Sequence, residues 1–81
     1  MIVMKPRPLW RQVADDLRTR ISSGEWAVGD RIPTHAQLAA QYDVSSTVIR
    51  RAVLELMHVD DLLVGQMGEA VFVTALPEDD D

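Results

Sequence analysis

Two short helical patterns stand close together in the middle of the chain, and their spacing restricts the possible folds more than any other feature. The first opens at Thr34, in the run Thr-His-Ala-Gln. The Thr34 hydroxyl can accept a hydrogen bond from the backbone of Gln37, whose side chain can reach back, as in a capping box. The pattern predicts a short helix that continues to about Gln41 and buries three side chains, those of Leu38, Ala39 and Tyr42.

The second pattern begins after only three connecting residues. In the connection, Asp43 can take the left-handed conformation that lets a chain reverse, and Ser45 can cap the next helix. Four apolar residues then recur at helical spacing and predict a helix over about 46–57: Ile49, Ala52, Val53 and Leu56. Two helices joined by so short a turn, the second opened by a hydroxyl cap, are typical of a helix-turn-helix.

A longer helix is predicted before this pair, over about 8–23. Its apolar residues recur at every fourth position: Leu9, Val13, Leu17 and Ile21. Pro8 suits the first helical turn, and Gly24 suits the position just past the end. The polar stripe of Arg11, Asp15 and Arg18 is expected to face outward.

After the third helix the period changes to that of short strands. Leu62–Val64 and Val71–Val73 are β-prone runs, and the loop between them contains two glycines, which predicts a hairpin. Three helices followed by a hairpin predict a mostly α fold with a small β wing, the winged helix-turn-helix, over residues 8–76. Between the first two helices, residues 24–33 are predicted to form a loop with a short extended end at Arg31–Ile32.

Charge is unevenly distributed along the chain. Of thirteen acidic residues, four are the run Glu78 to Asp81, so nine acidic residues face eight Lys and Arg in the rest. Lys5, Arg7 and Arg11 precede the first acidic residue, Asp15. We therefore expect a basic arm over residues 1–7 and an acidic, disordered tail over residues 77–81.

Several classes of function lack sequence support. The chain has no cysteine, and its two histidines lie far apart without a metal-binding or catalytic motif, so we expect neither an enzyme nor a metal or other cofactor. The apolar run Met1–Met4 is too short for a signal peptide, and no segment approaches the roughly 20 apolar residues of a membrane span. We expect a cytoplasmic protein with no membrane partner.

Four fragments, in order and at matching spacing, resemble one known family. They are LWRQVADDLRTRISSG, GDRIPT, LAAQYDVS and VSSTVIRRAVLEL, and the match runs from about Leu9 to Val73. Together they resemble the DNA-binding domain of GntR-type bacterial repressors. The resemblance implies a winged helix-turn-helix, a double-stranded DNA partner and a place at the bacterial nucleoid when bound.

The chain also departs from the family pattern at the expected DNA face. Where the family's second helix opens Ser-Glu-Arg and its wing has Gly-Arg-Gly-Thr, this chain has Thr34-His35-Ala36 and Gly68-Glu69-Ala70-Val71. The family's arginine after the recognition-helix serine is Ser46 here, whereas Arg50 matches the family's later arginine. Three positive charges are therefore missing, and Glu69 adds a negative one.

The candidate DNA contacts combine the resemblance with ordinary contact chemistry, in which arginines reach guanine or phosphate and helix N-termini face phosphate. They are Thr34, His35, Ser45, Ser46, Thr47, Arg50, Arg51, Gly68, Lys5, Arg7 and Arg11. Other roles remain open for several of them: Ser45 and Thr34 can serve as caps alone, and Arg51 can pair with Glu55 four residues later. Trp10 and Trp26 are interpreted as aromatics at the edge of the core rather than as a ligand platform.

Two functions remain open from the sequence. The first is a sequence-specific transcriptional regulator, a repressor in type, without an effector-binding domain, because only about eight residues follow the wing. A homodimer is then possible through Met1–Met4 or the first helix, and no small-molecule effector site is expected. The second is a degenerate winged helix that binds another protein and binds DNA weakly or not at all, which the missing arginines favour.

Overall fold

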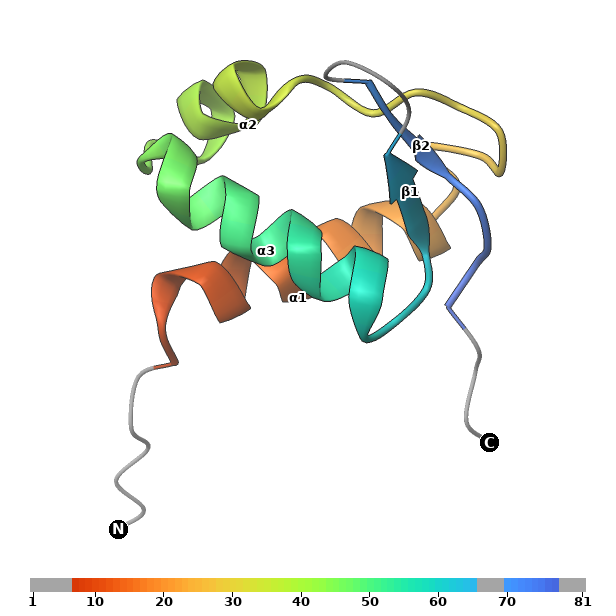
Figure 1. Cartoon of the computed structure of the whole chain (residues 1–81), viewed down its shortest axis with the longest axis horizontal. Coiled ribbons are helices and arrows are strands. Elements are labelled where there is room, and N and C mark those ends of the chain that lie inside the picture. The colour runs from red at the N-terminus through yellow and green to blue at the C-terminus, as the bar shows by residue number, and fades with distance from the viewer. Residues whose placement is uncertain (1–6, 66–69, 78–81) are drawn as a thin grey trace, which may run out of the picture.

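The computed structural model describes residues 7–65 and 70–77. In chain order it contains helices α1 (Leu9–Ser22), α2 (His35–Tyr42) and α3 (Ser46–His58), then strands β1 (Leu63–Gly65) and β2 (Val71–Val73) (Figure 1). The strands pair antiparallel. This arrangement confirms the predicted winged helix-turn-helix, with the hairpin as its wing. The predictions for Met1–Met4, Lys5, Gly68, Glu69 and the acidic run at the C-terminus lie outside the described residues.

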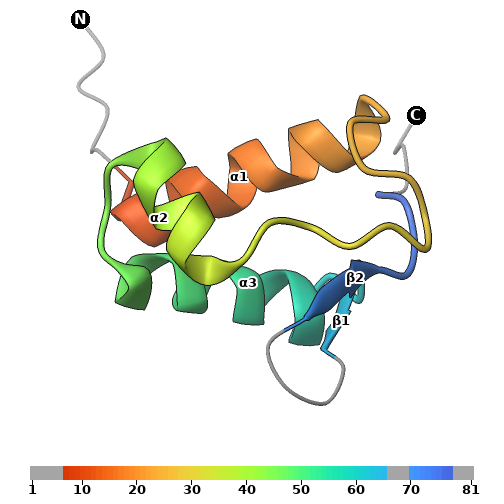
Figure 2. The same ribbon diagram turned by 90° about the horizontal axis from the view of Figure 1, so that it is seen from above.

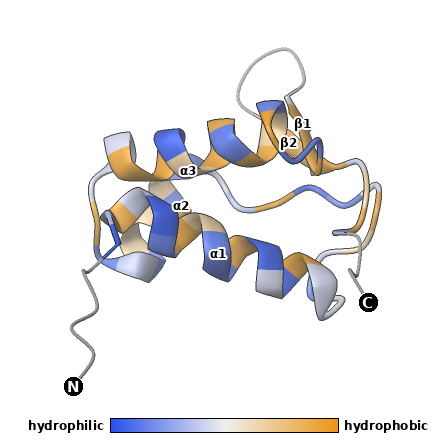
Figure 3. Ribbon diagram, turned by 90° about the horizontal axis from the view of Figure 1, so that it is seen from below, coloured by the Kyte–Doolittle hydropathy of each residue, from blue (hydrophilic) through white to orange (hydrophobic). Residues whose placement is uncertain are grey.

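The core forms where α1 and α3 pack side by side, with both helices beginning at the same end of the molecule (Figures 1 and 2). Hydrophobic and hydrophilic positions alternate along both helices because one side of each is buried (Figure 3). The largest fully buried side chains come from all three helices and from β2: Leu17, Ile21, Leu38, Ile49, Val53, Leu56 and Val73. Since burying one such side chain contributes about 1.5–3 kcal/mol, this packing is the main source of stability.

Hydroxyl caps define the starts of α2 and α3, as predicted. The backbone N–H of Gln37 donates to Thr34 Oγ1 (3.1 Å), and the N–H of Thr34 donates to Gln37 Oε1 (2.9 Å), which completes the capping box. Asp43 has the predicted left-handed backbone, with φ of 55°. Ser45 Oγ then accepts from the N–H of Val48 at 3.3 Å. The start of each helix of the pair is therefore fixed by a local hydrogen bond, to the hydroxyl of Thr34 or of Ser45.

Some predicted boundaries were wrong by one residue. Pro8 is the N-cap of α1 and not part of its first turn, because its ψ of 150° is extended. His58, which lies beyond the predicted end of the third helix at residue 57, is the last residue of α3. The first strand begins at Leu63 rather than Leu62, because it is set by pairing with β2. Gly24 follows the end of α1 with φ of 91°, as predicted for a residue that ends a helix.

The loop between α1 and α2 runs along the wing. The N–H of Ile32 donates to the carbonyl of Val71 (2.9 Å), and the N–H of Val73 donates to the carbonyl of Asp30 (2.9 Å). Arg31 forms a bridge with Phe72, which confirms the predicted extended end of the loop. β2 is therefore hydrogen-bonded on both sides, and the wing is tied to the helical core through this loop.

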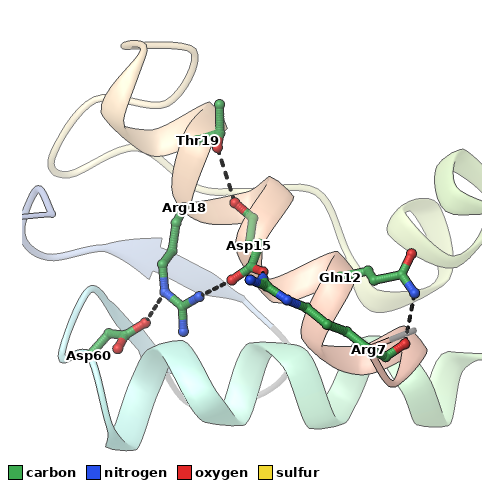
Figure 4. Close-up of polar contacts among 6 residues, drawn as sticks. All are labelled: Arg7, Gln12, Asp15, Arg18, Thr19 and Asp60. Carbon is green, nitrogen blue, oxygen red and sulfur yellow. Dashed lines mark hydrogen bonds and ion pairs between the residues drawn. The ribbon is translucent and has the colours of Figure 1, made fainter. Parts of the chain in front are cut away.

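The polar stripe of α1 faces outward only in part: Arg11 is exposed, as predicted, whereas Asp15 and Arg18 are half-buried. The Arg18 guanidinium contacts Asp15 one turn earlier (2.6 Å) and also Asp60, just after α3 (Figure 4). The Asp15 carboxylate is shared with Arg7. Arg18 is half-buried because α3 ends beside it, so a side chain that periodicity places outward instead joins two elements.

Replacing Ser45 by Ala removes the acceptor for the Val48 N–H, and we expect the free energy of unfolding to fall by about 1 kcal/mol. Urea unfolding followed by circular dichroism measures the loss. The matched control is Ser46→Ala, one residue later: this exposed side chain caps nothing, and Ala favours a helix, so stability should hold or rise slightly. Equal losses in both variants would contradict the cap assignment.

Candidate nucleic-acid interface

One side of α3 faces solvent, and most of its side chains are polar. Ile49, Ala52 and Val53 point into the core, and the opposite side is exposed. Four residues at helical spacing form this exposed strip of α3: Ser46, Thr47, Arg50 and Leu54. The strip begins at a capped helix N-terminus, where free backbone N–H groups favour anions. A major groove admits one α-helix, and hydroxyl and guanidinium groups on such a helix can contact base edges there.

The start of α2 contributes two further predicted residues. Thr34 is half-buried, and its hydroxyl oxygen accepts the capping bond, which leaves the hydroxyl hydrogen free to donate. His35 is half-buried, and its Nε2 is enclosed without a hydrogen-bond partner among the described residues. Ala36, where the family resemblance has an arginine, is exposed. The start of α2 therefore offers hydrogen-bonding groups from Thr34 and His35, whereas Ala36 has no positive side chain at the position of the family's arginine.

The arginines of the described residues divide into two groups. Three form ion pairs within the chain: Arg7, Arg18 and Arg20. The remaining four form none within the described ranges: Arg11, Arg31, Arg50 and Arg51. Of this second group, Arg11, Arg50 and Arg51 lie on the first turns of α1 and α3, at one end of the molecule (Figures 1 and 2). The guanidinium groups at that end can therefore bind an external anion.

Arg20 has a structural role that removes it from the candidate interface. Its guanidinium donates to Glu25 (2.6 Å), to Gln41 (3.0 Å) and to the Tyr42 hydroxyl (3.0 Å), and it stacks on the Trp26 ring at 4.3 Å. We call this set the Arg20 clasp. It joins α1, the following loop and the C-terminal end of α2, so it fixes how the helix-turn-helix is oriented on α1.

The electrostatics of the Arg20 clasp favour its ionised form. The hydrogen bond to Glu25 raises the pKa of Arg20 despite partial burial, and the same bond lowers the pKa of Glu25. Burial, together with a hydrogen bond that the Tyr42 hydroxyl donates to Asp16, raises the pKa of Tyr42 to about 12. At neutral pH the tyrosine therefore stays protonated, and the arginine charge is held by its neighbours.

Trp10 is a part of this surface that the sequence interpretation missed. The Arg51 guanidinium lies 4.6 Å from the centre of the Trp10 ring, and that of Arg11 lies 5.3 Å from it. Arg51 forms no ion pair with Glu55 in the part of the chain that the structure describes, so the alternative pairing within α3 was wrong. No sequence pattern links residues 10 and 51, because only the packing of α1 on α3 brings them together.

Metal-binding clusters and membrane-spanning helices are both missing from residues 7–65 and 70–77. Within these ranges, no cluster of three or more His, Cys, Asp or Glu side chains is placed to hold a metal ion. No helix found there is both long and apolar enough to cross a bilayer.

Known proteins provide an independent comparison. A family model described as bacterial regulatory proteins, gntR family, matches residues 9–73. The chain is 33% identical over 75 residues to the Exu regulon transcriptional regulator of Escherichia coli K12, covering 93% of this chain and 29% of that protein. It is 40% identical over 68 residues to the histidine utilization repressor of Klebsiella aerogenes, covering 84% and 28%. The chain thus spans less than a third of the length of these relatives.

Solved structures show the same likeness in three dimensions. AraR(DBD) in complex with an operator matches with a TM-score of 0.83 at 28% identity, covering 91% of this chain and 88% of that one. A GntR family transcriptional regulator from Listeria monocytogenes matches with a TM-score of 0.80 at 25% identity, covering 89% and 62%. The predicted resemblance and fold are therefore both confirmed.

The Arg20 clasp should make stability depend on pH through Glu25. Because the pKa of Glu25 is lowered from 4.5 in the folded state, its contribution is present above pH 4.5 and is lost as the pH falls through the folded value. We expect Glu25→Gln to lower the melting temperature at pH 7 and to lessen the further fall between pH 5 and pH 3. Thermal unfolding at several pH values measures this.

The matched control for the clasp is Glu55→Gln, which removes a carboxylate that forms no ion pair with another described residue. Its acid profile should follow that of the unaltered protein. If the two variants gave the same profile, the ion pair with Arg20 would not be the source of the pH dependence.

Proposed function

The chain belongs to the gntR family of bacterial regulatory proteins, and from this membership we propose that it binds double-stranded DNA sequence-specifically and regulates transcription as a repressor. In this proposal it acts by occupying an operator. A DNA ligand is also in keeping with the predicted location in the bacterial cytoplasm, at the nucleoid. The relatives are transcriptional regulators, which supports a binding function rather than catalysis.

The observation that carries the proposal is the exposed strip of α3 with Arg50 at its centre. Arg50 is exposed and forms no ion pair with another described residue, so its five N–H donors are available. In a major groove, an arginine in this position can donate two hydrogen bonds to one guanine. Ser46 and Thr47, at the start of the same helix, can donate to phosphate or to base edges.

The missing arginines bear on affinity rather than on the mode of binding. Each phosphate contact that is lost lowers the dependence of log K on log salt by about 0.9, so three lost charges weaken binding considerably at physiological salt. We infer that backbone N–H groups at the starts of α2 and α3, with Thr34 and His35, supply part of the remaining phosphate contacts. The roles of Lys5, Arg7 and Gly68 and the homodimer stay predictions.

The protein-binding alternative is the weaker proposal. Its support was the loss of positive charge from the family's DNA face, and that loss is real at Ala36 and Ser46. Against it stands the match to a domain solved together with its operator, at a TM-score of 0.83. Three arginines at one end form no ion pair with another described residue, and this positive charge suits a polyanion better than a neutral partner surface.

Selection from a random duplex pool, followed by titration of the selected duplex at several salt concentrations, tests the proposal. We expect Arg50→Ala to weaken binding and to narrow the preference for the selected duplex over a scrambled one, because a base contact is lost, and to lessen the salt slope because one charge beside the DNA is lost. The matched variant Arg50→Lys keeps the charge but not the two-bond geometry. It should keep the slope while losing preference for the selected duplex over a scrambled one.

If the protein enriches no duplex from the pool, the proposal is contradicted, and the protein-binding function is the one that remains. If a duplex is enriched but neither Arg50 variant changes its binding, the surface that contacts the bases does not lie on α3. Unfolding measured alongside confirms that the exposed Arg50 can be replaced without loss of the fold.

A further inference from the structure

A groove lies between the first turns of α1 and α3. It is shallow and open to solvent, has a volume of about 350 Å³ and is lined by Trp10, Thr47, Val48, Arg50, Arg51 and Leu54. The groove exists because α1 and α3 begin at the same end of the molecule, which brings the second residue of α1 beside the first two turns of α3 (Figures 1 and 2). Thr47, Arg50 and Leu54 belong to both this groove and the exposed strip of α3, so the two surfaces are continuous.

Trp10 holds Arg51 in a defined place within this groove. The guanidinium lies 4.6 Å from the ring centre, inside the range in which an aromatic face attracts a cation. A guanidinium restrained on a flat ring loses less rotamer freedom when it binds a ligand, and its edges remain free to donate hydrogen bonds. Because Arg51 has no ion pair with another described residue, those donors await an external acceptor.

The chemistry of the groove points to a ligand with both an anionic and an apolar part. Arg50 and Arg51 supply positive charge, with Arg11 close to the Trp10 ring on the α1 side. Val48, Leu54 and the indole supply an apolar floor. A sugar–phosphate backbone has both features, since its phosphates are anionic and its deoxyribose rings are largely apolar. When the exposed strip of α3 contacts the bases of a DNA strand, the backbone of that DNA must pass close to the strip and to the groove.

We propose that the Trp10–Arg51 pair forms a phosphate-binding position for the DNA backbone beside the exposed strip, with Trp10 acting as a positioning residue for Arg51. The inference rests on the proposed DNA binding and extends the interface from α3 onto α1. It assigns Arg51 a sequence-independent contact, in contrast to Arg50, which reads a base. The two adjacent arginines thus have separable effects on affinity and on specificity.

The test uses the full chain with the selected duplex and a scrambled duplex, each titrated over a series of salt concentrations. Arg51→Ala should weaken binding to both duplexes by the same factor and reduce the salt slope by about 0.9. Trp10→Leu should weaken binding in the same uniform way, and Trp10→Tyr should restore most of it, because tyrosine also offers an aromatic face. Arg50→Ala, by comparison, should narrow the preference between the duplexes.

A double-mutant cycle separates positioning from a general structural effect. In the Arg51→Ala background, Trp10→Leu should cause a much smaller loss, because the arginine nearest to the ring is gone. An equal loss from Trp10→Leu with and without Arg51 would overturn the inference, whether or not urea unfolding showed Trp10→Leu to be destabilised. Trp10→Tyr then serves as the folded variant for the comparison.

The failure of this inference and the failure of the proposed function give different results. If Arg50→Ala reduces binding while Arg51→Ala and Trp10→Leu leave it unchanged, the phosphate position is wrong and DNA reading by α3 stands. If no duplex is bound by the unaltered protein, both are overturned. Loss of preference between duplexes in Arg51→Ala would overturn the sequence-independent role.

Discussion

The packing of α1 against α3 is the contact on which the rest of the structure depends. Leu17 and Ile21 of α1 belong to the same hydrophobic core cluster as Ile49 and Leu56 of α3, and all four are fully buried. Because the two helices run side by side from the same end, their first turns form one surface (Figure 1). That surface contains the exposed strip of α3 and the groove beside Trp10. The packing of α1 on α3 thus fixes the position of α3 and leaves one side of its first turns exposed to solvent.

Charge is distributed to match this layout. Arg18 joins α1 to the turn after α3, and Arg20 joins α1 to the loop and to α2, so these two arginines hold the elements together. Arg50 and Arg51, on the first turns of α3, have no such internal partners among the described residues. A chain of net charge -5 can therefore still present positive charge at one end, where Arg50 and Arg51 are exposed and form no ion pair with another described residue. Net charge by itself is a poor guide to the partner of a domain this small.

Local rules accounted for the elements and for much of the candidate site. The capping box at Thr34, the left-handed Asp43 and the cap at Ser45 involve residues at most three apart, so sequence spacing predicts them. The exposure of Arg50 follows from the helical period once the buried side of α3 is known. The errors came from long-range contacts. Arg18 was expected to face outward, but it forms an ion pair with Asp60. Glu55 was the possible partner of Arg51 in the sequence, but the Arg51 guanidinium lies over the Trp10 ring.

The sequence by itself determined three helices, two of them started by hydroxyl caps, a hairpin and the family, because hydrogen bonds and apolar periods within a few residues encode them. Tertiary structure alone decided the long-range contacts of the arginines, since Arg18, Arg20 and Arg51 meet partners more than 20 residues away in the sequence, namely Asp60, Tyr42 and Trp10. Contacts over such separations depend on how the helices pack. No local pattern specifies that geometry, so the pairing of Arg51 with Trp10 became visible only in the folded chain.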